Sequence, residues 1–175
     1  MTIRPATPED AAEIARIWQL GWADGHLGLV PEELVEVRTE ESFRKRAAER
    51  VGDATVASVG GEVAGFVMVV GDEVEQVYVS ADHRGTGVAK ALMDEAERQV
   101  GANGHGEAWL AVVAGNARAR AFYERAGWRD EGSFDYAAGG PDDASKPEVR
   151  HRGVDCLRLP GRGPVAEAVV GGAQV

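Results

Sequence analysis

Apolar residues in the first part of the chain follow helical spacing after one short strand. Residues 3–6 read as the strand, and Thr7-Pro8-Glu9-Asp10 then supplies an N-cap, a first-turn proline and an acidic residue three positions after the cap. The apolar positions that follow are spaced as on one side of a helix, namely Ala11, Ile14, Ala15, Trp18 and Trp22. This spacing predicts an amphipathic helix that packs on the core.

Glycines and two further apolar segments follow this helix. We expect Gly21, Gly25 and Gly28 to loosen the chain, because glycine disfavours a helix interior. Residues 31–37 and 39–51 then predict one or two additional helices.

From residue 54 the apolar spacing becomes that of strands. Three apolar runs separated by glycine-containing turns predict three strands, over residues 54–59, 63–70 and 74–79. In the third of these, strict alternation would place Glu75, Val77 and Val79 on one face. After a glycine-rich turn, residues 88–101 predict a helix of about four turns.

The pattern of the remaining residues predicts further strands and one further helix. It predicts a strand over 107–113, a helix over 117–126 capped by Asn116 and stopped by Gly127, and a final pair of strands over 128–136 and 148–159. Residues 137–147 between those last strands read as a loop, because they are rich in Gly, Asp and Ala.

Composition places the chain among globular proteins. Its 175 residues are 44% apolar and 27% charged, which suits one domain over residues 1–160 and a tail over 161–175 that we expect to be mobile. No apolar run approaches the roughly 18 residues of a membrane span. The chain does not open on a secretory signal either, so we expect a cytoplasmic protein.

Charge and cysteine content limit the ligands and metals that we expect the protein to bind. Nineteen basic and 29 acidic residues give a net charge of -10, which disfavours nucleic acid and anionic membranes and attracts cationic substrates. Cys156 is the single cysteine, so it has no disulfide partner, and it stands far from any metal-ligand spacing. We expect Cys156 to be a packing residue and the protein to need no metal.

The stretch VYVSADHRGTGVA, residues 77–89, places a glycine-rich turn between a strand and a helix. The first N–H groups of a helix have no intrahelical acceptor, and the helix dipole favours negative charge at that end. Glycine in addition lets a ligand approach the backbone closely. The stretch therefore predicts an anion site suited to phosphate.

Spacing separates this turn from two other phosphate-binding motifs. A dinucleotide-binding fingerprint needs a third glycine where Lys90 stands, and a P-loop needs a Gly-Lys-Ser/Thr sequence that is absent. The pattern that remains, Arg84-x-x-Gly87-x-Ala89 directly after the strand, resembles the acetyl-CoA pyrophosphate loop of the GCN5-related N-acetyltransferase (GNAT) family.

A second segment supports this resemblance. The sequence NARARAFYERAGW, residues 116–128, is similar to the other cofactor-binding segment of the family, with an Asn, an aromatic pair and a Gly-aromatic dipeptide in the same order. The resemblance extends more weakly over residues 3–159. It implies an α/β (α+β) fold in which a mixed, mostly antiparallel sheet of six or seven strands is flanked by helices.

The resemblance also implies that acetyl-CoA is the cosubstrate. The backbone of one loop would hold its pyrophosphate, with contributions from Arg84, Gly85, Thr86, Gly87, Val88 and Ala89. Backbone groups of Val77 and Val79 would pair with the pantetheine arm, in a gap between their strand and the strand that carries Leu110. Asn116 would touch that arm, and Tyr123 would lie near the sulfur.

An amine that attacks the thioester directly needs a donor for the developing oxyanion and a proton for the departing thiolate. We assign the first role to the Val77 N–H and the second to Tyr123, because a phenol with an ordinary pKa of about 10 keeps its proton at neutral pH. Glu75, acting through a water, is the candidate base, and His26 is its rival. The alternatives are helix packing for Tyr123 and solvation for Glu75.

The expected function is that of an N-acetyltransferase, an acyltransferase that moves an acetyl group to a primary amine in a ternary complex. The alternative is a non-catalytic acyl-CoA-binding regulatory module. Phosphoryl transfer is disfavoured, because the P-loop lysine is absent. The acceptor is a small-molecule or peptide amine, and the resemblance also allows a homodimer.

Overall fold

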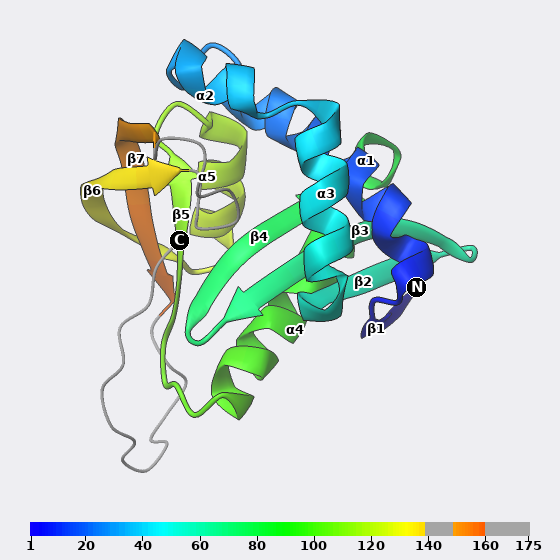
Figure 1. Cartoon of the computed structure of the whole chain (residues 1–175). Coiled ribbons are helices and arrows are strands. Elements are labelled where there is room, and N and C mark those ends of the chain that lie inside the picture. The colour runs from blue at the N-terminus through cyan, green and yellow to red at the C-terminus, as the bar shows by residue number, and fades with distance from the viewer. Residues whose placement is uncertain (139–148, 160–175) are drawn as a thin grey trace.

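The computed structural model describes residues 1–138 and 149–159, which form a seven-stranded sheet with helices on both faces (Figure 1). The strands are β1 (Thr2–Pro5), β2 (Ala54–Val59), β3 (Glu62–Val70), β4 (Glu73–Val79), β5 (Ala108–Val113), β6 (Arg129–Ala138) and β7 (Val149–Leu159). The helices are α1 (Ala11–His26), α2 (Glu32–Val37), α3 (Glu40–Arg50), α4 (Val88–Ala102) and α5 (Ala117–Arg125). The order of the strands in the sheet is β1-β2-β3-β4-β5-β7-β6. Strands β4 and β5 are parallel, and all other neighbouring strands are antiparallel. The mixed, mostly antiparallel architecture predicted from the sequence is confirmed.

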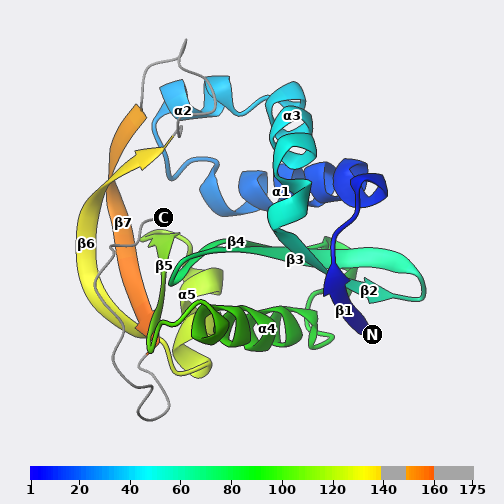
Figure 2. The same ribbon diagram turned by 60° about the horizontal axis from the view of Figure 1, so that its bottom comes forward.

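Each face of the sheet has its own core. Figure 2 shows α1, α2 and α3 on one face and α4 and α5 on the other. The first core is built around Trp18, Phe43 and Phe66. The ring centroid of Trp18 lies 5.9 Å from that of Phe43 and 5.7 Å from that of Phe66. The second contains Leu92 of α4 and Tyr123 of α5, packed on β-strand side chains. Burial of these apolar groups is what holds the helices on the sheet.

Side-chain caps stand at the start of three helices, and the sequence pattern predicts two of these caps, those at Thr7 and Asn116. Thr7 and Asp10 form a capping box ahead of α1, and Arg4 lowers the pKa of the Asp10 carboxyl to about 2 by donating hydrogen bonds to it. The Thr39 hydroxyl accepts from the Ser42 N–H at 3.1 Å at the start of α3. Asn116 Oδ1 accepts from the Ala119 N–H at 3.2 Å at the start of α5.

The expectation that Gly21, Gly25 and Gly28 loosen the chain is wrong for Gly21 and Gly25, because α1 continues to His26. Both glycines mark close contacts. A Cβ atom on Gly21 would collide with the Tyr78 ring of β4, and one on Gly25 would lie 2.8 Å from Asn116 Nδ2. The missing side chains therefore let α1 lie directly on the end of β4 and on the turn between β5 and α5.

Strand β4 contains a bulge that changes which face Glu75 occupies. Met68 of β3 pairs with Gln76, but its neighbour Val69 pairs with Val74, so Glu75 is an extra residue. Glu75 reaches Arg50 of α3, whereas Val77 and Val79 pack against the core on the α4 side. The expectation that Glu75 shares a face with the two valines is therefore wrong, since one inserted residue reverses the alternation.

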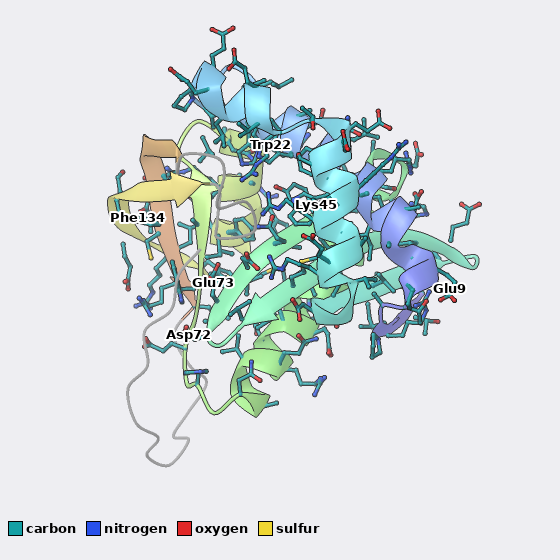
Figure 3. The ribbon with its side chains drawn as sticks, in the orientation of Figure 1. Glu9, Trp22, Lys45, Asp72, Glu73 and Phe134 are labelled. Atoms are coloured by element: carbon teal, nitrogen blue, oxygen red, sulfur yellow. The ribbon has the colours of Figure 1, made fainter. Side chains whose placement is uncertain are left out.

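Strands β4 and β5 touch at one end and then separate. Glu73 and Trp109 are their one paired position among the described residues, and the Trp109 N–H donates to the Asp72 carbonyl at 3.0 Å. Figure 1 shows the two strands diverging from that end, and Figure 3 labels Asp72 and Glu73 there. The gap between the strands that the resemblance implies is thus present in the structure.

The closing strands are confirmed as the antiparallel pair β6 and β7. Residues 139–148, most of the predicted loop between them, and residues 160–175, which include the predicted mobile tail, lie outside the described part of the chain.

Candidate functional site

The glycine loop, residues 84–89, leads directly from β4 into α4 through the short turn Ala81–His83. Gly85 and Gly87 have φ angles of 78° and 90°, a region that L residues avoid. A Cβ atom built on either glycine would meet nothing within 4 Å. The loop therefore presents bare backbone to open space, as a phosphate cradle requires.

The start of α4 adds donors to this loop. Gly87 is the N-cap residue, and no side chain accepts a hydrogen bond there. The N–H groups of the first turn, those of Val88, Ala89 and Lys90, therefore lack intrahelical acceptors and point out of the helix end. The Val88 side chain is buried in the α4-side core, so it anchors the helix while its backbone stays available. These features fit the pyrophosphate of the cosubstrate.

The edge of β4 that faces β5 offers a second backbone surface. The Ser80 N–H donates to the Ala64 carbonyl of β3 at 2.9 Å. Because N–H and C=O directions alternate along an antiparallel ladder, Val77 and Val79 turn their backbone groups away from β3 and toward β5. No described residue of β5 pairs with them, so this edge is able to accept an extended ligand as an added strand.

Tyr123 lies in the α4-side core with the valines of β4. Its ring packs against Trp128 at 5.9 Å and Phe122 at 5.3 Å between centroids, and 7% of the residue is exposed. Burial raises the pKa of the Tyr123 phenol above its ordinary value, so the group stays protonated at neutral pH. Val88 belongs to the same core, and Val77 and Val79 pack against it.

Asn116 lies where β5 ends, beside the last turns of α1. Its Oδ1 caps α5, and its Nδ2 faces Gly25 of α1. Leu29, which follows α1, covers the neighbouring Gly115 so closely that a Cβ there would lie 2.6 Å from its Cδ2. Helix α1 and the segment after it therefore span the far end of the gap between β4 and β5.

Glu75 lies on the opposite face of the sheet from Tyr123. Both of its carboxylate oxygens accept from the Arg50 guanidinium, with 2.7 Å between Arg50 Nη1 and Glu75 Oε1. The pair is half-buried, and Glu75 together with Asp53 raises the pKa of Arg50. Glu75 thus faces the side covered by α1, α2 and α3, with its carboxylate oriented by Arg50.

His26, the rival base, ends α1. Its ring stacks on Trp22 at 4.9 Å with 9° between the planes, and its Nδ1 lies 2.9 Å from the Trp22 carbonyl oxygen. Because a carbonyl only accepts, Nδ1 carries the proton and Nε2 carries the lone pair of the neutral ring.

Two residues at the site were not found from the sequence. Arg50 meets Glu75 from 25 residues away, and Asp24 of α1 forms an ion pair with Arg84 from 60 residues away. Neither stands in a motif, so no local pattern could have indicated them. Among the described residues, no cluster of His, Cys, Asp or Glu could hold a metal ion, and no helix is long and apolar enough to span a bilayer.

Solved structures show that this fold recurs. A GCN5-related N-acetyltransferase from Rhodopseudomonas palustris is 22% identical, with a TM-score of 0.67 over 91% of this chain and 94% of its own. PaiA N-acetyltransferase from Thermoplasma acidophilum, solved with coenzyme A, is 17% identical, with a TM-score of 0.62 over 91% and 98%. YncA from Salmonella typhimurium, solved with its cofactor acetyl-CoA, is 16% identical, with a TM-score of 0.67 over 97% and 99%.

No curated protein sequence matches the chain. The model of the acetyltransferase (GNAT) family, however, matches residues 14–128. That range contains most of α1, the glycine loop and the Asn116 segment, so it covers both parts on which the resemblance rested. The chain therefore belongs to the GNAT family of acetyltransferases, whose cosubstrate is acetyl-CoA.

Proposed function

We propose that the protein is an N-acetyltransferase that moves the acetyl group of acetyl-CoA to a primary amine by direct attack within a ternary complex. The observation that carries this proposal is the continuity of the glycine loop with the open edge of β4. One segment, residues 77–89, offers donors for a pyrophosphate and, next to them, an unpaired strand edge for an extended arm. Two structures of the same fold were solved with coenzyme A or acetyl-CoA, which supports this use of the loop.

In the proposed reaction, the amine nitrogen attacks the thioester carbonyl carbon. The C–S bond then breaks, the sulfur leaves as a thiolate, and the nitrogen loses a proton. The Val77 N–H, on the open edge of β4, is the proposed donor to the carbonyl oxygen as negative charge develops there. Tyr123 is the proposed proton donor to the thiolate, because its phenol is buried and protonated in the core against which Val77 and Val79 pack.

Glu75 is the proposed acceptor of the amine proton, through a water. It lies on the face covered by α1, α2 and α3, and Arg50 fixes the direction of its carboxylate. The same ion pair favours the second candidate function, an acyl-CoA-binding module without catalysis, because both carboxylate oxygens of Glu75 already accept hydrogen bonds from Arg50. His26 at the end of α1 would take the role of the base if Glu75 serves Arg50 alone.

The first experiment is calorimetric titration with acetyl-CoA of the wild type and of Gly87→Glu. We expect micromolar binding that weakens about tenfold or more in the variant, because the new carboxylate occupies the phosphate position. Gly104→Glu is the matched control. Gly104 also has a φ angle of 90° and open space around it, so its variant carries the same strain and charge at the other end of α4.

Activity is then measured as thiol released from acetyl-CoA in the presence of polyamines, amino acids, aminoglycosides and peptides. Release that depends on an amine supports the transferase. Binding without release for any of these amines would favour the regulatory module. Absence of acetyl-CoA binding by the folded wild type would overturn the proposal.

A further inference from the structure

Arg84, the first residue of the glycine loop, is held by a carboxylate of another element. Its Nη2 donates to Asp24 Oδ2 of α1 at 2.7 Å. About one third of the Arg84 side chain and about one half of the Asp24 side chain remain exposed, so water and ligands reach the pair. The loop and α1 are thus tied together at the position where an anionic ligand would approach.

Asp24 is presented from a fixed position. It stands one residue before Gly25, which is buried against Asn116, and three residues after Gly21, which lies on the Tyr78 ring. Arg84, by contrast, has an extended backbone followed by Gly85 at a φ angle of 78°. The side chain that can change partner is therefore the arginine, while the carboxylate stays in place.

A carboxylate and a phosphate compete for the same guanidinium, since both accept paired hydrogen bonds from it. The other cation at this helix start, Lys90, is also engaged, because its Nζ lies 2.6 Å from Asp94 Oδ2. Both described cations of the loop and the first turn of α4 are thus neutralised by carboxylates, and only one of these carboxylates, Asp24, comes from outside α4.

We propose that Asp24 is a built-in competitor for the phosphates of the cosubstrate. It holds Arg84 in the free protein, yields it when the pyrophosphate occupies the glycine loop, and takes it back as coenzyme A leaves. This inference rests on the proposed function. It gives α1 a part in setting cosubstrate affinity and product release, through Arg84 rather than through contact with the reacting atoms.

The test is calorimetric titration of wild type, Asp24→Asn and Asp24→Glu with acetyl-CoA and with coenzyme A. Removing the carboxylate releases Arg84 and removes a repelling charge, so we expect Asp24→Asn to bind both ligands about three- to tenfold more tightly. Asp24→Glu should return to the wild-type affinity. The difference should shrink near 1 M salt, where the screening length falls to about 3 Å.

Three comparisons separate this role from a structural one. Glu49→Gln removes an equally exposed carboxylate from α3, where it pairs with Lys45, and should leave the affinity unchanged. A thioester that ends at pantetheine and carries no pyrophosphate should bind wild type and Asp24→Asn equally. In the background of Asp24→Asn, Arg84→Gln should cost more affinity than in wild type, because only there is the arginine free beforehand.

Equal or weaker binding of acetyl-CoA by Asp24→Asn would overturn the inference, as would a gain of the same size in Glu49→Gln or with the phosphate-free thioester. These outcomes are distinct from failure of the proposed function, in which the wild type itself does not bind acetyl-CoA. The separate effects on KM and kcat are a second readout. Asp24→Asn should lower the KM for acetyl-CoA, and it should lower kcat where release of coenzyme A limits turnover.

Discussion

At the scale of single residues, the bulge in β4 determines which face of the sheet Glu75 occupies. Strict alternation would have turned its carboxylate toward the α4 side, the side on which Val77 and Val79 pack against the core that contains Tyr123. The bulge turns it to the other face, where Arg50 binds both oxygens. Glu75, the proposed proton acceptor, and Tyr123, the proposed donor, therefore lie on opposite faces of the sheet.

Glu75→Gln tests which role the carboxylate has. If Glu75 takes the amine proton, we expect kcat to fall about 100-fold, because the glutamine amide cannot accept that proton. The melting temperature should fall by only about 2–4 °C, since the amide keeps one hydrogen bond with Arg50. Thr55→Ser serves as the control, because it is a conservative change in β2, which β3 separates from β4 and the gap.

The opposite pattern would assign Glu75 to the structure alone. A kcat within about threefold of wild type, together with a lower melting temperature, would mean that Glu75 anchors α3 to the bulge. His26 would then be the next residue to replace.

At the scale of elements, α1 can lie close to β4 and to Asn116 because Gly21 and Gly25 have no side chains. A helix normally gains about 0.5–1 kcal/mol when an interior Gly becomes Ala. At Gly21 the added methyl group would meet the Tyr78 ring, so we expect Gly21→Ala to lower the free energy of unfolding by about 1–3 kcal/mol. Gly101 in α4 has nothing within 4 Å, and Gly101→Ala should be stabilising by the ordinary amount. Urea denaturation measures both, and a stabilised Gly21→Ala would contradict the close contact.

The elements themselves could largely be predicted from the sequence, because their signals are local. Each signal lies within a few adjacent residues. Examples are the caps at Thr39 and Asn116, the glycine turn of the β2–β3 hairpin and the glycine loop before α4. Gly21 shows the limit of such reasoning, since a helix-breaking preference and a close helix–strand contact produce the same residue.

The parts of the site that could not be predicted all join distant segments. The pairs Arg50–Glu75 and Asp24–Arg84 span 25 and 60 residues, and each depends on how a helix lies across the sheet. The bulge at Glu75 likewise exists only in the pairing of β4 with β3. Local propensity carries no information about such contacts, so the roles of these residues emerge only once the fold is known.

At the scale of the whole molecule, the negative charge opposes the site that the glycine loop creates. The chain carries a net charge of -10, while its cosubstrate is a polyanion. The donors at the start of α4 act only within a short distance, whereas the net charge repels at long range until salt screens it. An amine acceptor, which approaches as a cation, experiences the opposite long-range force.

The same charge should destabilise the folded state, and salt should reverse this. Raising NaCl from about 0.01 M to about 0.15 M shortens the Debye length from about 30 Å to about 8 Å, which screens the mutual repulsion of the acidic surface. Ion pairs such as Arg44–Glu40 and Lys90–Asp94 weaken as well, but exposed pairs of this kind contribute at most about 0.5 kcal/mol each. We therefore expect the melting temperature at pH 7.5 to rise by about 2–4 °C.

The control for this prediction is the same titration near the isoelectric point, which the composition places at about 4.9. There the net charge is close to zero, so added NaCl has little repulsion to screen and the melting temperature should stay constant or fall slightly. A fall at pH 7.5 would show that local ion pairs outweigh the net charge. An equal rise at both pH values would point to a general salt effect on apolar burial, because that effect does not depend on the protonation of the carboxylates.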